Sequence, residues 1–202
     1  MNVCYIVGAA KCSRLPSPDK TDLVIAADGG YDTLCRAGIR CDLLIGDLDS
    51  IKERETDVET IKHPTMKDET DMHLAYLEGK KRGYTSFRLY GGVGGRVDHT
   101  FANYCLLSYI SREGFEAVLY DREYIAYAIT NKSTRVTGEK GKGISVFAFG
   151  GDASGVSIKG LYYEADGVTL TPSFPLGASN RKTGETAEIS VKDGTLLIFE
   201  EI

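Results

Sequence analysis

The feature that most constrains the fold is a change of sequence pattern near residue 122. Before it, short apolar runs alternate with stretches of helical periodicity; after it, β-branched and aromatic runs follow one another, broken by glycine. The first pattern is typical of a parallel sheet covered by helices, and the second of an antiparallel sandwich or barrel. We predict an α/β fold: an N-terminal, mainly parallel, three-layer α/β domain over residues 1–122, followed by a C-terminal all-β sandwich over residues 123–202.

The expected first domain alternates strands with helices. Its strands are Val3–Val7, Leu23–Ala27, Leu43–Ile45, Phe87–Tyr90 and Ala117–Tyr120. Its helices are Tyr31–Ala37, Asp68–Arg82 and Asp98–Ile110. Glycine is a common residue directly after a helix, so Gly38 and Gly83 are the expected ends of the first two helices.

The expected second domain contains only strands. They are Tyr124–Thr130, Ile144–Phe149, Val156–Ile158, Val168–Thr171, Ala187–Val191 and Leu196–Phe199. The dipeptides Asp166-Gly167 and Asp193-Gly194 each separate two extended runs, and Asp-Gly is a strong signal for a tight hairpin turn. We therefore expect hairpins at both positions.

Charge and cysteine content narrow the class of partner. The formal net charge of −5 argues against a nucleic acid or an anionic membrane as partner, because both favour a basic surface. The five cysteines contain no C-x-x-C pair and form no evident disulfide framework, and the first apolar run is too short for a signal peptide or a membrane span. We expect a cytoplasmic protein that acts on small molecules.

Glycine and aspartate residues follow the expected parallel strands. Gly8, Asp28-Gly29-Gly30, Gly46–Ser50 and Gly91–His99 come directly after four of these strands. Ligands of open α/β sheets bind outside the carboxyl ends of the strands. The sequence therefore predicts that these segments converge on one site.

Three aspartates in this region are candidate metal ligands. Asp47 and Asp49 are two residues apart in an extended segment, which places both carboxylates on one side of the chain, and Asp71 lies near the start of the long helix. Carboxylates arranged in this way suit Mg²⁺, which leaves coordination positions open for phosphate. The alternatives are a turn stabilised by Asp and Ser side chains, and acidic residues that only stabilise the helix N-terminus.

The glycine-rich loop Gly91–His99 is a candidate phosphate site. It matches neither the Walker A spacing nor G-x-G-x-x-G. Gly92, Gly94 and Gly95 would nevertheless allow backbone N–H groups to approach phosphate oxygens, and Arg96 would add a permanent positive charge. The alternative is a purely structural glycine turn.

Taken together, the sequence resembles the thiamin pyrophosphokinase family. The segments that carry the resemblance occur in the family's order along nearly the whole chain. They are Ala27–Gly30, Ile45–Ser50, Asp68–Asp71, Gly91–His99, Ser179-Asn180 and Ser190–Gly194.

The resemblance implies a reaction and an assembly. The reaction transfers the terminal pyrophosphoryl group of ATP, with Mg²⁺, to the hydroxyl of thiamin and gives thiamin diphosphate and AMP. The implied assembly is a homodimer whose active sites lie at the subunit interface and use both domain types. The alternatives are another pyrophosphokinase, such as one acting on hydroxymethylpterin, and a non-catalytic sensor of thiamin or nucleotide.

The resemblance also implies residue roles. Asp47, Asp49 and Asp71 would be metal and catalytic carboxylates, with Arg96 as a further catalytic residue, and either Asp71 or Asp49 would accept the hydroxyl proton. The implied nucleotide-binding residues are Asp28, Gly29, Gly30, Thr70, Gly92, Gly94, Gly95, Arg96 and Asp98. The implied thiamin-side residues are Asp98, Ser179 and Asn180.

Some positions depart from the family pattern. Tyr31-Asp32 follows Gly30 where Ala-Asn is common, and Arg181-Lys182 follows Asn180 where Glu-Phe is common in bacterial members. The chain has no tryptophan, so the ring stacking that animal members use for thiamin falls to another aromatic side chain. The unranked candidates are Tyr162, Tyr163 and Phe174.

Overall fold

The computed structural model describes residues 2–46, 57–62 and 68–202 and divides into two compact units. The first unit comprises Met1–Leu106 and Ala117–Arg122, and the second comprises Leu107–Glu116 and Glu123–Ile202. The end of the third helix is therefore grouped with the second unit. The fold class is confirmed: an α/β unit is followed by an antiparallel β unit.

The first unit is built on a sheet with strand order β6-β5-β1-β2-β3-β4. Its strands are β1 (Cys4–Val7), β2 (Leu23–Ala27), β3 (Leu43–Gly46), β4 (Glu59–Lys62), β5 (Ser86–Tyr90) and β6 (Glu116–Tyr120). The pairs β1–β2, β1–β5, β2–β3 and β3–β4 are all parallel. The helices are α1 (Gly30–Ala37), α2 (Asp71–Lys81) and α3 (Val97–Arg112), the last of which extends across the unit boundary.

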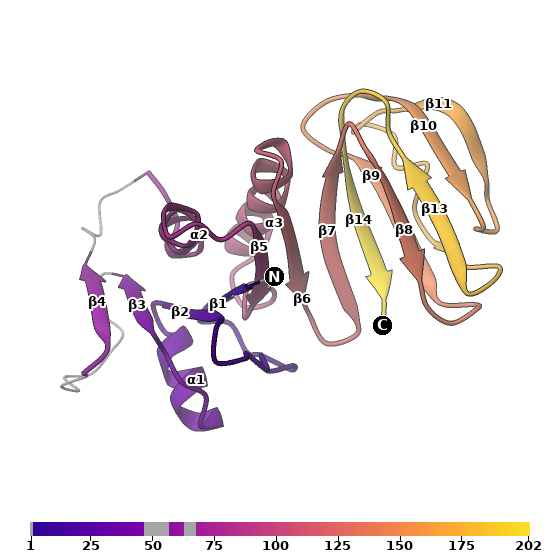
Figure 1. Cartoon of the computed structure of the whole chain (residues 1–202). Coiled ribbons are helices and arrows are strands. Elements are labelled where there is room, and N and C mark those ends of the chain that lie inside the picture. Colours follow the sequence, from indigo (N-terminus) through magenta and orange to yellow (C-terminus); the bar gives the residue numbers. More distant parts are fainter. Residues whose placement is uncertain (1, 47–56, 63–67) are drawn as a thin grey trace. The chain divides into compact units, whose positions relative to one another are not determined.

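Helices cover both faces of this sheet, which explains its continuous apolar strands. Every residue of β2 and β3 is buried. Leu34 of α1 packs with Val7, Val24 and Leu44 on one face. On the opposite face, Gly79 of α2 lies against Cys4 of β1 and Phe87 of β5. Figure 1 shows α1 and α2 on opposite sides of the sheet, as the three-layer prediction requires.

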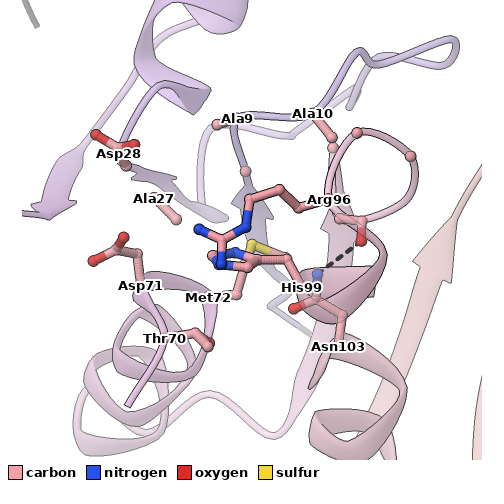
Figure 2. A pocket seen from close by; sticks show the side chains of 15 residues that line it. Ala9, Ala10, Ala27, Asp28, Thr70, Asp71, Met72, Arg96, His99 and Asn103 are labelled. Atoms are coloured by element: carbon pink, nitrogen blue, oxygen red, sulfur yellow. Dashed lines mark hydrogen bonds between the residues drawn. The ribbon is translucent and has the colours of Figure 1, made fainter. Parts of the chain in front are cut away.

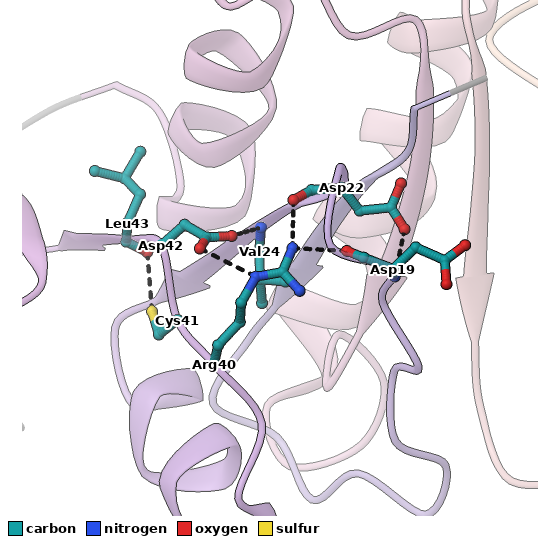
Figure 3. Close-up of polar contacts among 7 residues, drawn as sticks. All are labelled: Asp19, Asp22, Val24, Arg40, Cys41, Asp42 and Leu43. Atoms are coloured by element: carbon teal, nitrogen blue, oxygen red, sulfur yellow. Dashed lines mark hydrogen bonds and ion pairs between the residues drawn. The ribbon is translucent and has the colours of Figure 1, made fainter.

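The amino-terminal edge of the sheet is fixed by a polar network (Figure 3). Arg40 donates hydrogen bonds to the carbonyl oxygen of Asp19 (2.9 Å) and to Asp42 Oδ1 (3.2 Å). The other oxygen of Asp42 accepts from the backbone N–H of Val24 at 2.8 Å, where β2 begins. These contacts join the loops that lead into β2 and β3.

The second unit is a sandwich of two antiparallel sheets. One has the order β12-β9-β14-β7 and the other β11-β10-β13-β8. The strands are β7 (Tyr124–Thr130), β8 (Ser133–Thr137), β9 (Gly143–Ala148), β10 (Ala153–Lys159), β11 (Ala165–Leu170), β12 (Asn180–Arg181), β13 (Thr186–Ser190) and β14 (Thr195–Glu201). Residues such as Val146, Val156, Ile189 and Ile198 form the apolar core between the sheets. No helix in the described ranges is both long and apolar enough to span a membrane.

The sandwich also contains a buried ion pair. Lys182 Nζ lies 2.5 Å from Glu200 Oε1, and the two side chains are only 1% and 10% exposed. Lys182 also donates to the carbonyl oxygen of Thr137 at 3.3 Å, and the hydroxyl of Tyr127 donates to Glu200 Oε2 at 3.4 Å. Burial, together with the Glu200 charge, raises the pKa of Tyr127.

Both expected Asp-Gly hairpins are wrong. Asp166 and Gly167 lie inside β11, where the pairing with β10 shifts register and Gly167 has a φ of 65°. The dipeptide therefore forms a bulge. Asp193 and Gly194 connect β13 with β14, which belong to different sheets, so this turn joins the two layers of the sandwich.

Three observed strands were missing from the expected set. The strands β4 and β8 are largely polar and solvent-accessible, and β8 buries only Val136, so neither has a clear apolar pattern. The third, β12, is only two residues long. The helix α2 begins at Asp71 and not at Asp68, because Thr70 caps it by accepting the backbone N–H of His73 at 3.3 Å.

Candidate active site

A pocket of about 350 Å³ lies in the first unit at the carboxyl ends of its parallel strands (Figure 2). Segments after β1, β2 and β5 and the first turns of α2 and α3 build it. The lining residues are Gly8, Ala9, Ala10, Ala27, Asp28, Thr70, Asp71, Met72, Gly91, Gly92, Gly94, Gly95, Arg96, His99 and Asn103. This volume suits a small-molecule ligand.

Asp28 is held in an unusual backbone conformation at the end of β2. Its φ is 49°, which is uncommon for a residue other than glycine, and its backbone N–H donates to the carbonyl oxygen of Ile45 at 2.8 Å. A side chain at Gly46 would meet the Asp28 backbone, since an added Cβ would lie 3.2 Å from its Cα. The end of β3 therefore packs closely against Asp28. Asp47 and Asp49, which follow Gly46 in sequence, lie outside the described residues.

The N-terminus of α2 forms another wall of the pocket. The Thr70 cap fixes the first turn of the helix, and both Thr70 and Asp71 line the pocket. Figure 2 shows Asp28 and Asp71 along one side, with the Arg96 side chain extending into the pocket from another. Two carboxylates and one guanidinium therefore share one cavity.

Glycines shape the loop between β5 and α3. Gly91, Gly94 and Gly95 have φ values of 61°, 87° and 69°, a region that other residues rarely adopt. Gly92 is enclosed, because an added Cβ would lie 2.9 Å from Asn103 Nδ2. The same amide group donates a hydrogen bond to the Gly92 carbonyl oxygen at 2.7 Å and anchors the loop to α3.

Arg96 and Asp98 form an exposed ion pair at the end of this loop. Arg96 Nε donates to Asp98 Oδ1 at 3.1 Å, and the two side chains are 71% and 64% exposed. The hydrogen bonds from Arg96 lower the pKa of Asp98 to about 2. The guanidinium thus lies at the pocket with one carboxylate already beside it.

The structure brings together most of the described residues that were expected to bind nucleotide. Asp28, Thr70, Gly92, Gly94, Gly95 and Arg96 all line the pocket, and so does Asp71, which was expected to be a metal and catalytic carboxylate. Gly29, Gly30 and Asp98 do not line it. Gly30 has a clear packing reason, since an added Cβ would lie 1.8 Å from the carbonyl oxygen of Val7 and glycine lets α1 approach β1 closely.

Several residues of the pocket had not been expected from the sequence. Met72, Asn103 and the pair Ala9-Ala10 were not named, and His99 was named only as the last residue of the glycine-rich loop. His99 and Asn103 are four residues apart on α3, so helical spacing from the glycine loop would have placed both on one face. The alanines carry no polar signal that could have identified them.

Of the residues expected on the thiamin side, Asp98 belongs to the first unit, and Ser179 and Asn180 belong to the second. Ser179 is exposed, has a φ of 59° and donates its backbone N–H to Ser145 Oγ at 3.0 Å. Asn180 is only 4% exposed, and its side chain bonds the backbone of Tyr163. These two neighbouring residues therefore differ in what they can offer a ligand.

Two family models match the chain. The model described as "Thiamin pyrophosphokinase, catalytic domain" matches residues 17–119. The model described as "Thiamin pyrophosphokinase, vitamin B1 binding domain" matches residues 128–196. A curated relative, thiamine pyrophosphokinase of Bacillus subtilis, is 27% identical over 188 residues, which cover 90% of this chain and 88% of that protein.

Solved structures share the fold. The crystal structure of thiamine pyrophosphokinase from Bacillus subtilis has a TM-score of 0.90 at 23% identity and covers 99% of both chains. Thiamin pyrophosphokinase from Candida albicans has a TM-score of 0.76 at 15% identity, covering 100% of this chain and 89% of the other. At these identities the structural matches concern the fold, and the family models carry the assignment.

Proposed function

Because the chain belongs to the thiamin pyrophosphokinase family, we propose that the pocket of its first unit binds ATP with Mg²⁺ and that Ser179 and Asn180 serve the thiamin side. The activity is ATP-dependent transfer of pyrophosphate to thiamin, which yields thiamin diphosphate and AMP.

The observation that carries the proposal is the composition of the pocket. It combines a glycine loop, the N-terminal turns of two helices and Arg96. Helix N-termini and bare backbone N–H groups bind phosphate oxygens, and a guanidinium adds a bidentate contact. The roles of Gly92, Gly94, Gly95 and Arg96 are therefore to hold the polyphosphate of ATP, with Thr70 beside it. Gly29, Gly30 and Asp98 do not line the pocket; Asp98 pairs with Arg96, and Gly30 lets α1 approach β1.

The donor groups of the pocket fit a magnesium ion. Within the described ranges, no three His, Cys, Asp or Glu residues are grouped closely enough to hold a metal, but Asp28 and Asp71 both line the pocket. Asp47 and Asp49 follow Gly46, which packs against Asp28. Carboxylate oxygens are the ligands that Mg²⁺ prefers. Asp47, Asp49 and Asp71 would hold the ion, which would neutralise charge on the polyphosphate.

The protein's own side chains account for the remaining steps. One carboxylate, Asp71 or Asp49, accepts the proton of the thiamin hydroxyl as its oxygen attacks the β-phosphorus of ATP. The new O–P bond forms while the bond between the β-phosphorus and the α,β-bridging oxygen breaks, and AMP leaves. Arg96 and the glycine N–H groups hold the transferred group in place throughout.

We also propose a homodimer in the cytoplasm. Val97 and Phe101 on α3 are 83% and 60% exposed, and they are four residues apart, on one helix face. Apolar side chains gathered in this way support contact with a second subunit. Light scattering coupled to size-exclusion chromatography would report the mass, and a monomer at micromolar concentration would contradict the dimer.

Product analysis tests the proposed function. The protein is incubated with ATP, Mg²⁺ and either thiamin or hydroxymethylpterin, and the products are separated by chromatography. We expect AMP and thiamin diphosphate in equal amounts and no product from the pterin. Stoichiometric ADP with thiamin monophosphate, or AMP formed only with the pterin, would contradict the assignment. Thiamin binding without any product would support the sensor instead.

A further inference from the structure

The pocket of the first unit contains a buried asparagine to which the proposed function gives no role. Asn103 on α3 is 4% exposed and lines the pocket. Its Nδ2 donates to the carbonyl oxygen of Gly92 at 2.7 Å. A carbonyl oxygen can only accept a hydrogen bond, so this contact fixes the amide group with its nitrogen toward the glycine loop and its oxygen on the other side.

The Oδ1 atom of Asn103 is turned toward the pocket (Figure 2). In the part of the chain that the structure describes, the bond to Gly92 is the one hydrogen bond that this side chain forms. An amide oxygen has two lone pairs, and a polar group that loses water when a ligand binds needs a new partner. A ligand that covers Oδ1 must therefore present a hydrogen-bond donor to it.

The chemistry of ATP limits which part of the nucleotide can supply this donor. At neutral pH the phosphate oxygens carry negative charge and accept hydrogen bonds, so they repel the lone pairs of another acceptor. The donors of ATP are the ribose hydroxyls and the adenine amino group. An acceptor that faces the pocket therefore favours contact with the nucleoside half of the molecule.

The lining beside Asn103 is also of the kind that suits a nucleoside. Met72 lies next to Gly92, because an added Cβ on this glycine would lie 3.4 Å from Met72 Cε and 2.9 Å from Asn103 Nδ2. Ala9 and Ala10 line the same pocket. Apolar side chains with a few fixed polar groups are typical of pockets that bind small organic ligands. The acceptor oxygen thus borders an apolar part of the pocket.

We propose that Asn103 Oδ1 accepts a hydrogen bond from a donor on the nucleoside half of ATP, either a ribose hydroxyl or the adenine amino group. This inference rests on the proposed function for the choice of nucleotide. Asn103 then determines specificity through its oxygen and holds the glycine loop through its nitrogen. One side chain links recognition of the nucleoside to the position of the loop that binds the polyphosphate.

Nucleotide analogues that each lack one donor test the proposal and distinguish the possible donors. Calorimetry with Mg²⁺ and without thiamin gives a Kd for ATP, 2′-deoxy-ATP, 3′-deoxy-ATP and purine riboside triphosphate, which lacks the amino group. We expect one analogue to bind wild-type protein about fivefold more weakly than ATP, the usual size of a neutral hydrogen bond, and this analogue identifies the donor. In Asn103→Leu, that analogue and ATP should bind within about twofold of each other.

The ratio of the Kd for the analogue to the Kd for ATP is the decisive readout. Asn103→Leu also removes the bond to Gly92, so a purely structural role would weaken ATP and every analogue by the same factor and keep the wild-type ratio. That result would overturn the proposal, as would a wild-type protein that binds ATP and all analogues within about twofold. Asn103→Asp keeps an acceptor oxygen but loses the NH₂ group, so it should bind every nucleotide more weakly and still prefer the one with the donor.

Two further variants serve as controls. Asn2→Leu makes the same substitution at an exposed asparagine that does not line the pocket, and it should keep the wild-type ratio. Asn103→Ala leaves room for a water molecule at the Gly92 carbonyl oxygen and replaces Asn103→Leu if that variant does not fold.

Binding and turnover separate the failure of this inference from that of the proposed function. Wild-type protein that prefers ATP over one analogue, and loses this preference in Asn103→Leu, supports the contact even if it forms no thiamin diphosphate, a result that would contradict the proposed function alone. Wild-type protein that forms thiamin diphosphate but keeps its ratio in Asn103→Leu would overturn the contact alone. Wild-type protein that does not bind ATP would overturn both.

Discussion

The two units prepare their candidate ligand contacts in different ways. In the first unit, topology brings them together: strand ends, helix N-termini and a glycine loop meet around one pocket, and backbone geometry sets much of its shape. In the second unit, one buried amide side chain and a set of cross-loop hydrogen bonds fix an exposed ring pair, Tyr162 and Tyr163. Strand order is therefore enough to locate the pocket of the first unit, whereas the ring pair of the second unit depends on individual side-chain contacts.

The sandwich should be the unit most sensitive to a single polar substitution. Lys182→Ala leaves the buried Glu200 carboxylate without its cation, and we expect a loss of about 3–5 kcal/mol in the free energy of unfolding. Urea titration followed by circular dichroism measures this loss. The paired change Lys182→Met with Glu200→Leu removes both charges and should recover most of the stability. A loss below about 1 kcal/mol for Lys182→Ala would show that the ion pair contributes little.

A substitution in the pocket of the α/β unit should instead lower the catalytic turnover without unfolding the protein. Asp71→Asn keeps the side-chain shape but removes the charge, and we expect turnover to fall about 100- to 1,000-fold, as for the loss of other charge-stabilising groups in active sites. Asp47→Asn and Asp49→Asn should behave in the same way. Asp32→Asn, an exposed aspartate on α1 that does not line the pocket, is the matched control. Near-normal turnover of folded Asp71→Asn at saturating Mg²⁺ would contradict the proposed role.

A substitution at Gly30 shows whether this glycine is needed for the packing of α1 or for contact with the nucleotide. Gly30→Ala places a Cβ 1.8 Å from the Val7 carbonyl oxygen, so α1 must shift, and we expect a loss of about 1–3 kcal/mol in the free energy of unfolding. Gly38→Ala is the control for the backbone effect alone, because Gly38 has a φ of 64° and no neighbour near its added Cβ. Weaker ATP binding by Gly30→Ala with unchanged stability would show that Gly30 contacts the nucleotide.

The smallest expected effect concerns the exposed Arg96–Asp98 pair. Arg96→Gln removes the hydrogen bonds that lower the pKa of Asp98 to about 2, so this pKa should rise toward about 3.9, its ordinary value. A lowered pKa stabilises the folded state above the ordinary pKa, and this contribution disappears as the pH falls through the folded-state value. The ion pair therefore loses its effect between about pH 4 and pH 2. Carbon-detected NMR titration of the Asp98 carboxyl group measures this pKa. An unchanged pKa in Arg96→Gln would show that Arg96 does not lower it.

The sequence predicted the order of the fold and the position of the pocket well. The strands β1, β2, β3 and β5 and the glycine loop have strong apolar or glycine patterns, and the position of the segments at the carboxyl ends of the strands placed Asp28 and Arg96 near one another. The assignment to the thiamin pyrophosphokinase family is confirmed.

Contacts between residues far apart in the sequence could not be predicted from local sequence patterns. The Asp166-Gly167 pattern indicates a local turn, but pairing between β10 and β11 places it in a bulge. The contact between Asn180 and Tyr163 spans 17 residues, and no local pattern reveals it. Such contacts depend on how the strands pair, so they appear only in the folded unit.

Separate ligand titrations test the division between the units most directly. Calorimetry of Arg96→Gln and Asn180→Ala with a non-hydrolysable ATP analogue and Mg²⁺, and then with thiamin at saturating analogue, gives a Kd for each ligand. We predict that Arg96→Gln raises the Kd of the analogue about tenfold and the Kd of thiamin less than twofold. Asn180→Ala should raise the Kd of thiamin about tenfold and the Kd of the analogue less than twofold, as expected for lost polar or aromatic contacts. Equal weakening of both ligands by either variant would contradict the account.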